Sequence, residues 1–284
     1  MNRKHRKSLK QYLAGPYLIW MTGFTIIPLF LIAWYGLTDA SGSFTLDNVL
    51  SIATPEHAKA LFLSLGLSLL STAICLLLAY PLAYSISRSG ERVQRTMVMI
   101  IMLPMWMNFL LRTYAWMTLL EDNGLINQFF RLLGLLGPEE SLHMINTNGA
   151  VVLGMVYNFL PFMVLPLYSV MTKIDSRVIE AAQDLGSNGF QVLLRVILPL
   201  SVPGILSGIT MVFVPAVSTF VITKLLGGSK VLLIGDAIET MFIGQGANYN
   251  VGAALSLVLM VLILLCMAMT SFADKDDEEG GLVL

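Results

Sequence analysis

The residues best suited to chemistry in this chain lie in one polar segment, residues 173–203, between two apolar stretches. Within it, Glu180 is followed directly by Ala181 and Ala182, and Gly186 comes four residues later. On a short helix, the two small side chains would let the helix enter a groove on another protein, where the carboxylate of Glu180 could meet a cation. The predicted chemistry is therefore recognition of a soluble partner, and no catalytic step is implied.

Local signals place this helix between residues 175 and 186. Asp175 or Ser176 can serve as the N-cap, and Gly186 supplies the left-handed residue that commonly ends a helix. Apolar and small side chains recur at helical spacing along one face, at Val178, Ala181, Ala182 and Leu185. The chain then returns to apolar sequence at Leu198-Pro199, where a proline bends the path into the next apolar stretch.

The composition shows what must position this segment. Of 284 residues, 56% are hydrophobic and 12% are charged, with a mean hydropathy of +0.76. A soluble domain carries about a quarter charged residues, so the chain is an all-α integral membrane protein. Apolar runs long enough to cross a bilayer as helices predict six spans, at residues 14–37, 61–87, 96–120, 149–171, 205–226 and 251–272. A basic segment 1–13 precedes this membrane domain 14–272, and an acidic tail 273–284 follows it.

The distribution of lysine and arginine predicts the orientation. These residues gather in segment 1–13, in the loop after the second span and in segment 173–203, and are scarce in the alternate loops. The positive-inside rule then places both termini and the polar segment in the cytoplasm. The basic N-terminus attracts anionic lipid, and a net charge of −1 gives no basis for binding nucleic acid.

Other catalytic or cofactor motifs are missing from the sequence. The two cysteines and three histidines are scattered without metal-ligand spacing. Gly227-Gly228-Ser229-Lys230 has the wrong order and spacing for a phosphate-binding loop. We expect no metal and no cofactor bound by this chain, so uphill transport would draw its energy from an ion gradient or from a partner.

The polar segment resembles the EAA loop of permease subunits in binding-protein-dependent ABC importers. The resemblance rests on Glu180-Ala181-Ala182, three further residues, Gly186, nine further residues, and then Val196-Ile197-Leu198-Pro199. Val196 departs mildly, because the family usually has isoleucine there. The stretches NFLLRTY (108–114), LPFMVLPLYS (160–169) and LGGSKVLLIGD (226–236) resemble the permeases for spermidine and putrescine within this superfamily.

The resemblance implies a type I ABC importer permease fold in a bacterial cytoplasmic membrane. It implies four kinds of partner: a second permease subunit in a heterodimer, two ATPase subunits that use ATP and Mg²⁺, an external solute-binding protein and a polyamine substrate. It assigns the ATPase-coupling surface to Glu180, Ala181, Ala182, Gly186, Leu198 and Pro199. The chain itself would bind no ATP and would not be an enzyme.

A polyamine path needs aromatic faces for cation–π contact and carboxylates for ammonium groups. The candidate aromatic residues are Trp106, Tyr114, Trp116, Tyr157, Phe162 and Tyr168, and the candidate acids of an outer vestibule are Glu121, Asp122, Asp236 and Glu239. Packing and solvated loops are the plainer interpretations of both sets. Arg112 within the third span would repel a cation. It would pair with an acid of the partner subunit, hold backbone carbonyls, bar small cations or mark a path for anions.

Three other interpretations remain at this stage. The importer could carry another small solute, such as iron, thiamine or a phosphonate, since related permeases share the loop. An ion-coupled secondary transporter would show intramembrane carboxylates and internal repeats, and neither is evident. A membrane scaffold or sensor would form a closed bundle without a cavity.

Overall fold

The computed structural model describes residues 15–244 and 246–280, and these residues are helical, with one isolated β-bridge between Thr38 and Phe44 and no strand. The predicted basic segment 1–13 and the last four residues of the predicted acidic tail lie outside the described residues. The chain forms two compact units, residues 1–58 with 238–261 and residues 59–237 with 262–284.

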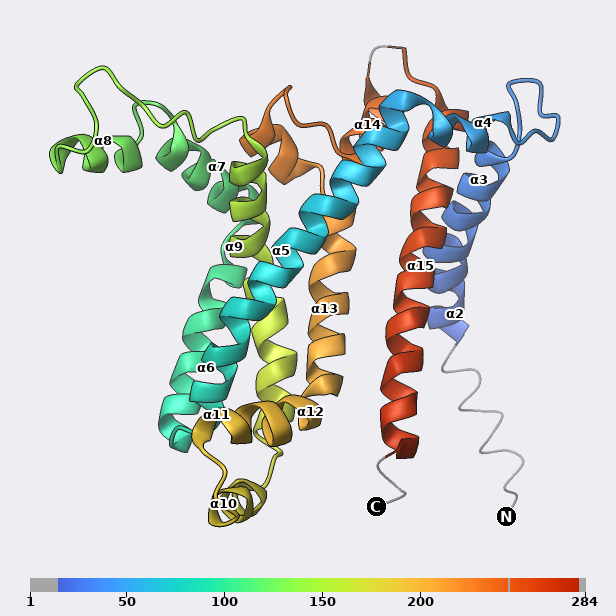
Figure 1. Cartoon of the computed structure of the whole chain (residues 1–284). Coiled ribbons are helices and arrows are strands. Elements are labelled where there is room, and N and C mark those ends of the chain that lie inside the picture. Colours follow the sequence, from blue (N-terminus) through green and yellow to red (C-terminus); the bar gives the residue numbers. More distant parts are fainter. Residues whose placement is uncertain (1–14, 245, 281–284) are drawn as a thin grey trace, which may run out of the picture. The chain divides into compact units, whose positions relative to one another are not determined.

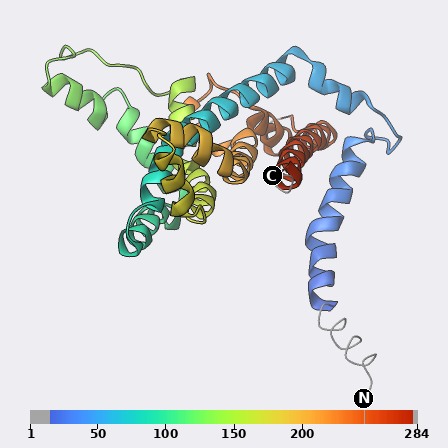
Figure 2. The same ribbon diagram turned by 60° about the horizontal axis from the view of Figure 1, so that its bottom comes forward.

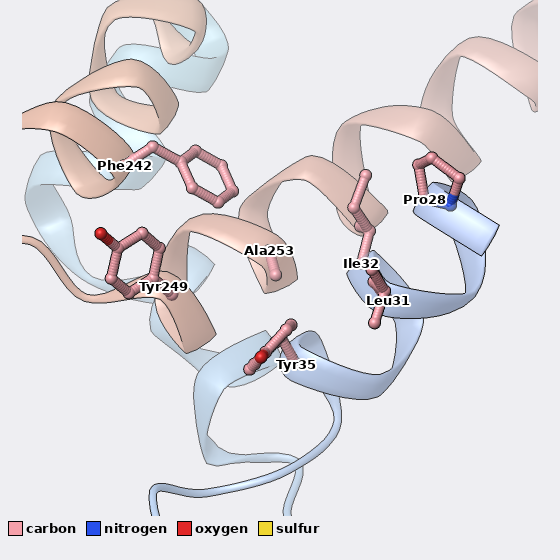
Figure 3. Close-up of a pocket in the computed structure, with 7 residues that line it drawn as sticks. All are labelled: Pro28, Leu31, Ile32, Tyr35, Phe242, Tyr249 and Ala253. Carbon is pink, nitrogen blue, oxygen red and sulfur yellow. The ribbon is translucent and has the colours of Figure 1, made fainter. Parts of the chain in front are cut away.

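The first unit contains one apolar helical stretch near the N-terminus, formed by α2 (Gly15–Met21), the π-helical turn η1 (Thr22–Ile26) and α3 (Ile27–Gly36). The short elements α4 (Asp47–Leu50) and η2 (Ser51–Ala53) follow. α3 packs closely on α15 (Tyr249–Gly280) at Gly36, which has no side chain to separate the helices. A Cβ there would lie 2.7 Å from Cδ1 of Leu257. An apolar pocket of about 410 Å³ opens between α3, α14 (Ile234–Ile243) and α15, with Tyr35, Phe242 and Tyr249 in its lining (Figure 3).

The second unit holds the main core and six helices of the described chain besides the coupling elements and parts of α14 and α15. They are α5 (Pro55–Ser87), α6 (Glu91–Trp106), α7 (Phe109–Leu120), α8 (Leu125–Leu132), α9 (Asn148–Met171) and α13 (Val202–Val217). α9 lies at the centre, with Met155, Met163, Leu167 and Met171 fully buried. The unit is therefore organised around α9.

α9 and α13 approach closely because glycines of α13 face α9. A Cβ on Gly204 would lie 3.1 Å from the carbonyl oxygen of Pro166, and a Cβ on Gly208 would lie 2.6 Å from Sδ of Met163. Two glycines four residues apart remove the side chains that would otherwise separate two membrane helices. The sequence Gly204 to Gly208 therefore sets the spacing of this helix pair.

Four helices are long and apolar enough to cross a membrane, at Pro16–Gly36, Pro55–Ser87, Asn148–Met171 and Tyr249–Thr270. Two further pairs of helices meet the same test only when the two helices of a pair are taken together. Glu91–Trp106 and Phe109–Leu132 are bent by 88° relative to each other. Gly189–Leu200 and Val202–Val217 are bent by 68°. The described residues therefore provide four spans, or six if each bent pair is counted as one.

The predicted third span, 96–120, differs most from the structure. It breaks at Met107 and Asn108, and Oδ1 of Asn108 accepts a hydrogen bond from the backbone N–H of Leu110 at 2.8 Å, so that Asn108 starts a new helix, α7. The predicted fifth span, 205–226, also ends early, since α13 stops at Val217 and a π-helical turn, η4 (Thr223–Gly227), follows it. At the first break, Asn108 caps the start of a new helix although the sequence on both sides is apolar.

The polar segment and α8 lie at opposite ends of the second unit (Figure 1). The polar segment forms α10 (Ser176–Asp184), α11 (Gly189–Val192), the π-helical turn η3 (Leu193–Ile197) and α12 (Leu198–Leu200). In the turned view these elements lie across the ends of the long helices (Figure 2). We call residues 173–203 the coupling segment below.

Candidate functional site

α10 has a well-defined beginning and end. The side-chain oxygen Oδ1 of Asp175 accepts a hydrogen bond from the N–H of Arg177 at 2.9 Å. At the other end Gly186 has a φ of +85°, its N–H donates to the carbonyl of Gln183 at 2.8 Å, and the N–H of Ser187 donates to the carbonyl of Ala182 at 3.1 Å. This pair of bonds is a Schellman motif. The predicted N-cap at Asp175 and the predicted stop at Gly186 are confirmed.

One face of α10 displays exposed apolar side chains. Val178, Ala181 and Leu185 lie three and four residues apart and share this face, and Leu185 is 88% exposed. Glu180 is also exposed, and it makes no hydrogen bond or ion pair with any residue that the structure describes. An exposed leucine next to small residues on a short helix is typical of a protein-docking surface.

The coupling segment then returns to the long helices through a bend made of short helical elements. Asn188 and Gln191 form a capping box at the start of α11, with bonds of 2.9 and 3.0 Å. Ile197 is fully buried, whereas Leu198 and Pro199 are exposed at the bend itself. Leu198 and Pro199 therefore belong to the bend before α13 and not to α10.

The six candidate aromatic residues do not form one lining. The structure brings Trp116 and Tyr157 together in an edge-to-face contact with ring centroids 5.3 Å apart. Tyr168 lies eleven residues further along α9 than Tyr157, about 16 Å away, and its hydroxyl donates to Oε1 of Gln94 at 3.0 Å. Trp106 and Tyr114 are exposed near the break between α6 and α7, and Phe162 packs against the core.

The four candidate acids are also in different surroundings. Glu121 is exposed at the end of α7, and Oδ1 of Asp122 lies 3.0 Å from Nδ1 of His143 in an exposed loop. Asp236 is only 4% exposed, and its carboxylate accepts the N–H of Leu233 at 3.0 Å at the start of α14. Glu239 follows one turn later on α14 and is half-buried. Asp236 thus stabilises the start of its own helix, α14.

Arg112 is buried in the first turns of α7, with 8% of its surface exposed. Its Nε and Nη1 groups have no hydrogen-bond acceptor among the described residues. α7 packs against η4, where the buried hydroxyl of Thr223 is likewise without a partner in that part of the chain. A buried guanidinium with unused donors is costly, and this arrangement fits a group whose partner comes from outside the chain.

Two residues of the α5 region touch the coupling segment, and sequence reasoning gave neither of them a role there. The hydroxyl of Tyr80 lies 3.0 Å from Oγ of Ser201, and the guanidinium of Arg88 bonds to backbone carbonyls where α9 ends. Arg88 entered the sequence analysis only as part of the charge pattern. The contacts join residues 83 to 121 positions apart in the chain, so no local pattern could have indicated them.

Apolar helices that meet the requirements of membrane spans, with an exposed short helix between two of them, are the features of a transport permease. The sequence profile of the family described as "Binding-protein-dependent transport system inner membrane component" matches residues 76–275. Because this match covers more than half of the chain, the chain belongs to that family of permease subunits, which are not themselves the ATPases of their transporters.

The relatives of the chain include polyamine permeases. It is 38% identical, over 84% of both chains, to the spermidine/putrescine transport system permease protein PotB of Haemophilus influenzae. It is 36% identical to PotB of Escherichia coli K12, over 84% of this chain and 88% of that protein. It is also similar to the inner membrane ABC transporter permease protein YdcU of the same organism, at 28% identity over 87% of this chain and 83% of YdcU.

Solved structures support the fold. A chain of a bacterial ABC transporter involved in the import of the acidic polysaccharide alginate matches with a TM-score of 0.76 at 18% identity, over 96% of both chains. The same kind of transporter in complex with its pentasaccharide-bound periplasmic protein matches with a TM-score of 0.74 at 18% identity, over 94% of this chain and 93% of that chain. These matches confirm the coarser prediction, a helical fold like that of ABC importer permeases.

Proposed function

We propose that this chain is a permease subunit of an ATP-driven importer that moves spermidine or putrescine into a bacterial cell. The proposal rests on the PotB relatives, which are named for these substrates and match 84% of the chain. The observation that carries the transport mechanism is α10, a short helix at the end of the long helices, whose apolar face is exposed. A second permease, two ATPase subunits and an external solute-binding protein would complete the transporter.

The coupling role follows from the surface of α10. Leu185 and the neighbouring small side chains would enter a cleft of the ATPase, and Glu180 would meet a cation there. Closure of the ATPase dimer on ATP would then move α10 and, through it, the spans from an inward-open to an outward-open arrangement. This chain would bind no ATP itself, since ATP and Mg²⁺ would be held by the partner ATPase.

The topology that suits this role has six spans with both termini in the cytoplasm. Each bent helix pair counts as one span in this arrangement, and an even number of spans returns the chain to the side where it began. Arg88, Arg92 and Arg95 flank the turn between α5 and α6, and Lys173 and Arg177 lie in the coupling segment. The positive-inside rule assigns that end of the unit to the cytoplasm, where the ATPase would be.

The substrate path is supported by fewer contacts. The Trp116–Tyr157 pair offers two aromatic faces, each worth about 0.5–2 kcal/mol to an ammonium group depending on its desolvation. Glu121 and Asp122 lie at the far end of α7 from Arg112 and could attract a cation released by the binding protein. We place the outer part of the path along α7 and α9.

Arg112 favours a second candidate substrate class. A buried guanidinium with unused donors would attract a carboxylate or phosphate group and repel a polyamine. If Arg112 lines the path, the substrate would be an anionic solute such as a phosphonate, and if a partner acid neutralises it, the polyamine assignment stands. Iron and thiamine importers and an ion-coupled transporter have no specific observation in their favour.

The test is uptake of radiolabelled spermidine and putrescine by proteoliposomes. They would contain this chain with its second permease and ATPase, and receive loaded binding protein. We compare the parent with Glu180→Lys and with the control Glu91→Lys, which makes the same charge change at an exposed site in the first turn of α6. The control should cost α6 no more than about 1 kcal/mol.

We expect ATP-dependent uptake by the parent and the control, and loss of uptake by Glu180→Lys in an assembled complex. An assembled, ATP-hydrolysing complex that takes up no polyamine would overturn the substrate. Uptake that is independent of ATP would overturn the importer class. Full uptake by Glu180→Lys would remove the coupling role of α10.

A further inference from the structure

The α5 region holds both ends of the coupling segment. At the entry, Arg88 follows the last residue of α5; its Nη1 donates to the carbonyl of Ile174 and its Nη2 to the carbonyl of Met171, both at 3.3 Å. At the exit, the hydroxyl of Tyr80 lies 3.0 Å from Oγ of Ser201, the residue at the bend into α13. The entry contact lies just ahead of α10, which begins at Ser176.

Arginine suits the entry site for reasons of geometry and charge. Met171 is the last residue of α9 and is fully buried, and the final carbonyls of a helix have no partner within the helix. A guanidinium offers several N–H groups in a fixed planar fork, so that one side chain can reach two carbonyls. A positive charge is also favoured at the C-terminal end of the α9 dipole. The guanidinium of Arg88 therefore caps the last carbonyl of α9 and also binds the linker that leads from α9 to α10.

Neighbouring side chains hold Arg88 itself in place. Its guanidinium carbon lies 5.8 Å from the centroid of the Tyr84 ring, which is a cation–π distance. Gln94 of α6 donates from Nε2 to the carbonyls of Ser87 and Ser89, on either side of Arg88, at 3.1 and 2.8 Å. The Oε1 of Gln94 accepts from the hydroxyl of Tyr168 on α9 at 3.0 Å. The turn that carries Arg88 is thus tied to α9 independently of Arg88.

The two ends of the coupling segment are joined to the α5 region by different kinds of contact. The entry has two charge-assisted bonds to backbone, whereas the exit is joined to α5 by a neutral bond between the hydroxyls of Tyr80 and Ser201. An apolar cavity of about 540 Å³ lies beside that pair, between α5 and the side chains of Leu193, Leu198 and Ile205. The entry is therefore joined to the α5 region by two bonds to backbone carbonyls, and the exit by one bond between side chains.

We propose that Arg88 is a positioning residue for transport, which fixes the direction in which α10 leaves α9 so that movement of the ATPase is passed to the spans. The proposal rests on the proposed coupling role of α10. Without the two Arg88 bonds, the linker between Met171 and Ser176 would keep only its own turn hydrogen bonds and would act as a looser hinge. α10 would still dock on the ATPase, but its movement would be absorbed by the linker, and ATP would be hydrolysed with little transport.

The experiment measures the ratio of polyamine imported to ATP hydrolysed in proteoliposomes that hold the whole complex. The variants are Arg88→Gln, which removes the charge, and Arg88→Lys, which keeps the charge but loses the fork. The matched control is Arg92→Gln, because Arg92 is exposed near the same turn and its side chain bonds to no residue that the structure describes. It removes the same charge from the first turn of α6, four positions from Arg88.

We expect the transport ratio of Arg88→Gln to fall about tenfold, the change that one charge-assisted hydrogen bond corresponds to. Arg88→Lys should fall less, since an ammonium can reach one of the two carbonyls, and Arg92→Gln should keep the parental ratio. An unchanged ratio in Arg88→Gln, whether both rates persist or fall together, would show a purely structural role and overturn the proposal. If Arg88→Gln does not assemble, the ratio of Arg88→Lys decides in the same way.

Failure of the proposed function would look different. A parental complex without ATP-dependent polyamine uptake, or a Glu180→Lys variant with the parental ratio, would remove the substrate or the coupling role before any Arg88 variant is compared. An altered ratio for Arg88→Gln alone, with Arg92→Gln at the parental value, is the result that only the positioning role gives.

Discussion

Gly186 ends α10 with a φ of +85°, and replacing it with alanine should loosen the coupling segment without creating a clash. No heavy atom lies within 4 Å of the position that a Cβ on Gly186 would take, so the cost comes from the backbone alone. A side chain in the left-handed region costs about 1–2 kcal/mol. That energy opposes the two bonds of the Schellman motif, from the N–H groups of Gly186 and Ser187.

Hydrogen exchange of these two amides in the assembled complex measures the effect. A cost of about 1–2 kcal/mol raises the open population about 5- to 30-fold, and exchange should accelerate by the same factor. Gly186→Asn should exchange at an intermediate rate, because asparagine tolerates the left-handed region better than alanine. Polyamine uptake should fall in the same order.

Gly189→Ala is the matched control for this prediction. Gly189 starts α11 three residues later, has no neighbour within 4 Å of the position that its Cβ would take and does not have a positive φ. The same chemical change there should leave the exchange of Gly186 and Ser187 unaltered. Equal exchange in Gly186→Ala and Gly189→Ala would refute the reasoning, because it would mean that the left-handed turn does not hold the end of α10.

Two further predictions concern stability, measured as the thermal unfolding midpoint of the purified complex. Gly204→Ala should destabilise by about 1–3 kcal/mol through overpacking against Pro166, whereas Gly66→Ala, with no atom within 4 Å, should not; equal midpoints would contradict the close approach of α9 and α13. Ser64→Ala should cost about 1–3 kcal/mol by orphaning the N–H of Ile234, which Oγ of Ser64 accepts at 2.7 Å. Ser68→Ala should cost little, because its buried Oγ has no partner in the described chain, and a larger loss for Ser68→Ala would contradict this account.

Local signals in the sequence were enough to predict α10. Asp175 and Gly186 act within a few residues of themselves, so capping rules apply to them without knowledge of the rest of the fold. The break in the predicted third span could also have been inferred, since Pro104 comes shortly before Asn108, a good N-cap residue. Hydropathy alone does not indicate this break, because the residues on both sides of it are apolar.

The structure separates residues that the sequence analysis grouped as one candidate path. Aromatic residues were grouped by span, but Tyr157 and Tyr168 lie at different levels of α9, and Trp116 is the candidate whose ring contacts Tyr157. Asp236 was taken for a vestibule acid, yet its carboxylate binds the N–H of Leu233 inside the fold. Where these side chains lie depends on contacts between distant parts of the chain. The spacing of residues in the sequence does not show those contacts.

α5 connects two contacts on which the proposed coupling depends. Ser64, near one end, accepts the N–H of Ile234 at the first turn of α14, and Arg88, just past the other end, binds the entry of the coupling segment. Ser64 and Arg88 are 24 positions apart, which corresponds to about 36 Å along a helix, more than the hydrocarbon thickness of about 30 Å. Pro81 lies between Tyr80 and Arg88 and removes one hydrogen bond of the helix there. Because α5 is otherwise continuous, a displacement at the coupling segment reaches the start of α14 through a single helix, and the weakest point of that connection lies between the two residues that hold the segment.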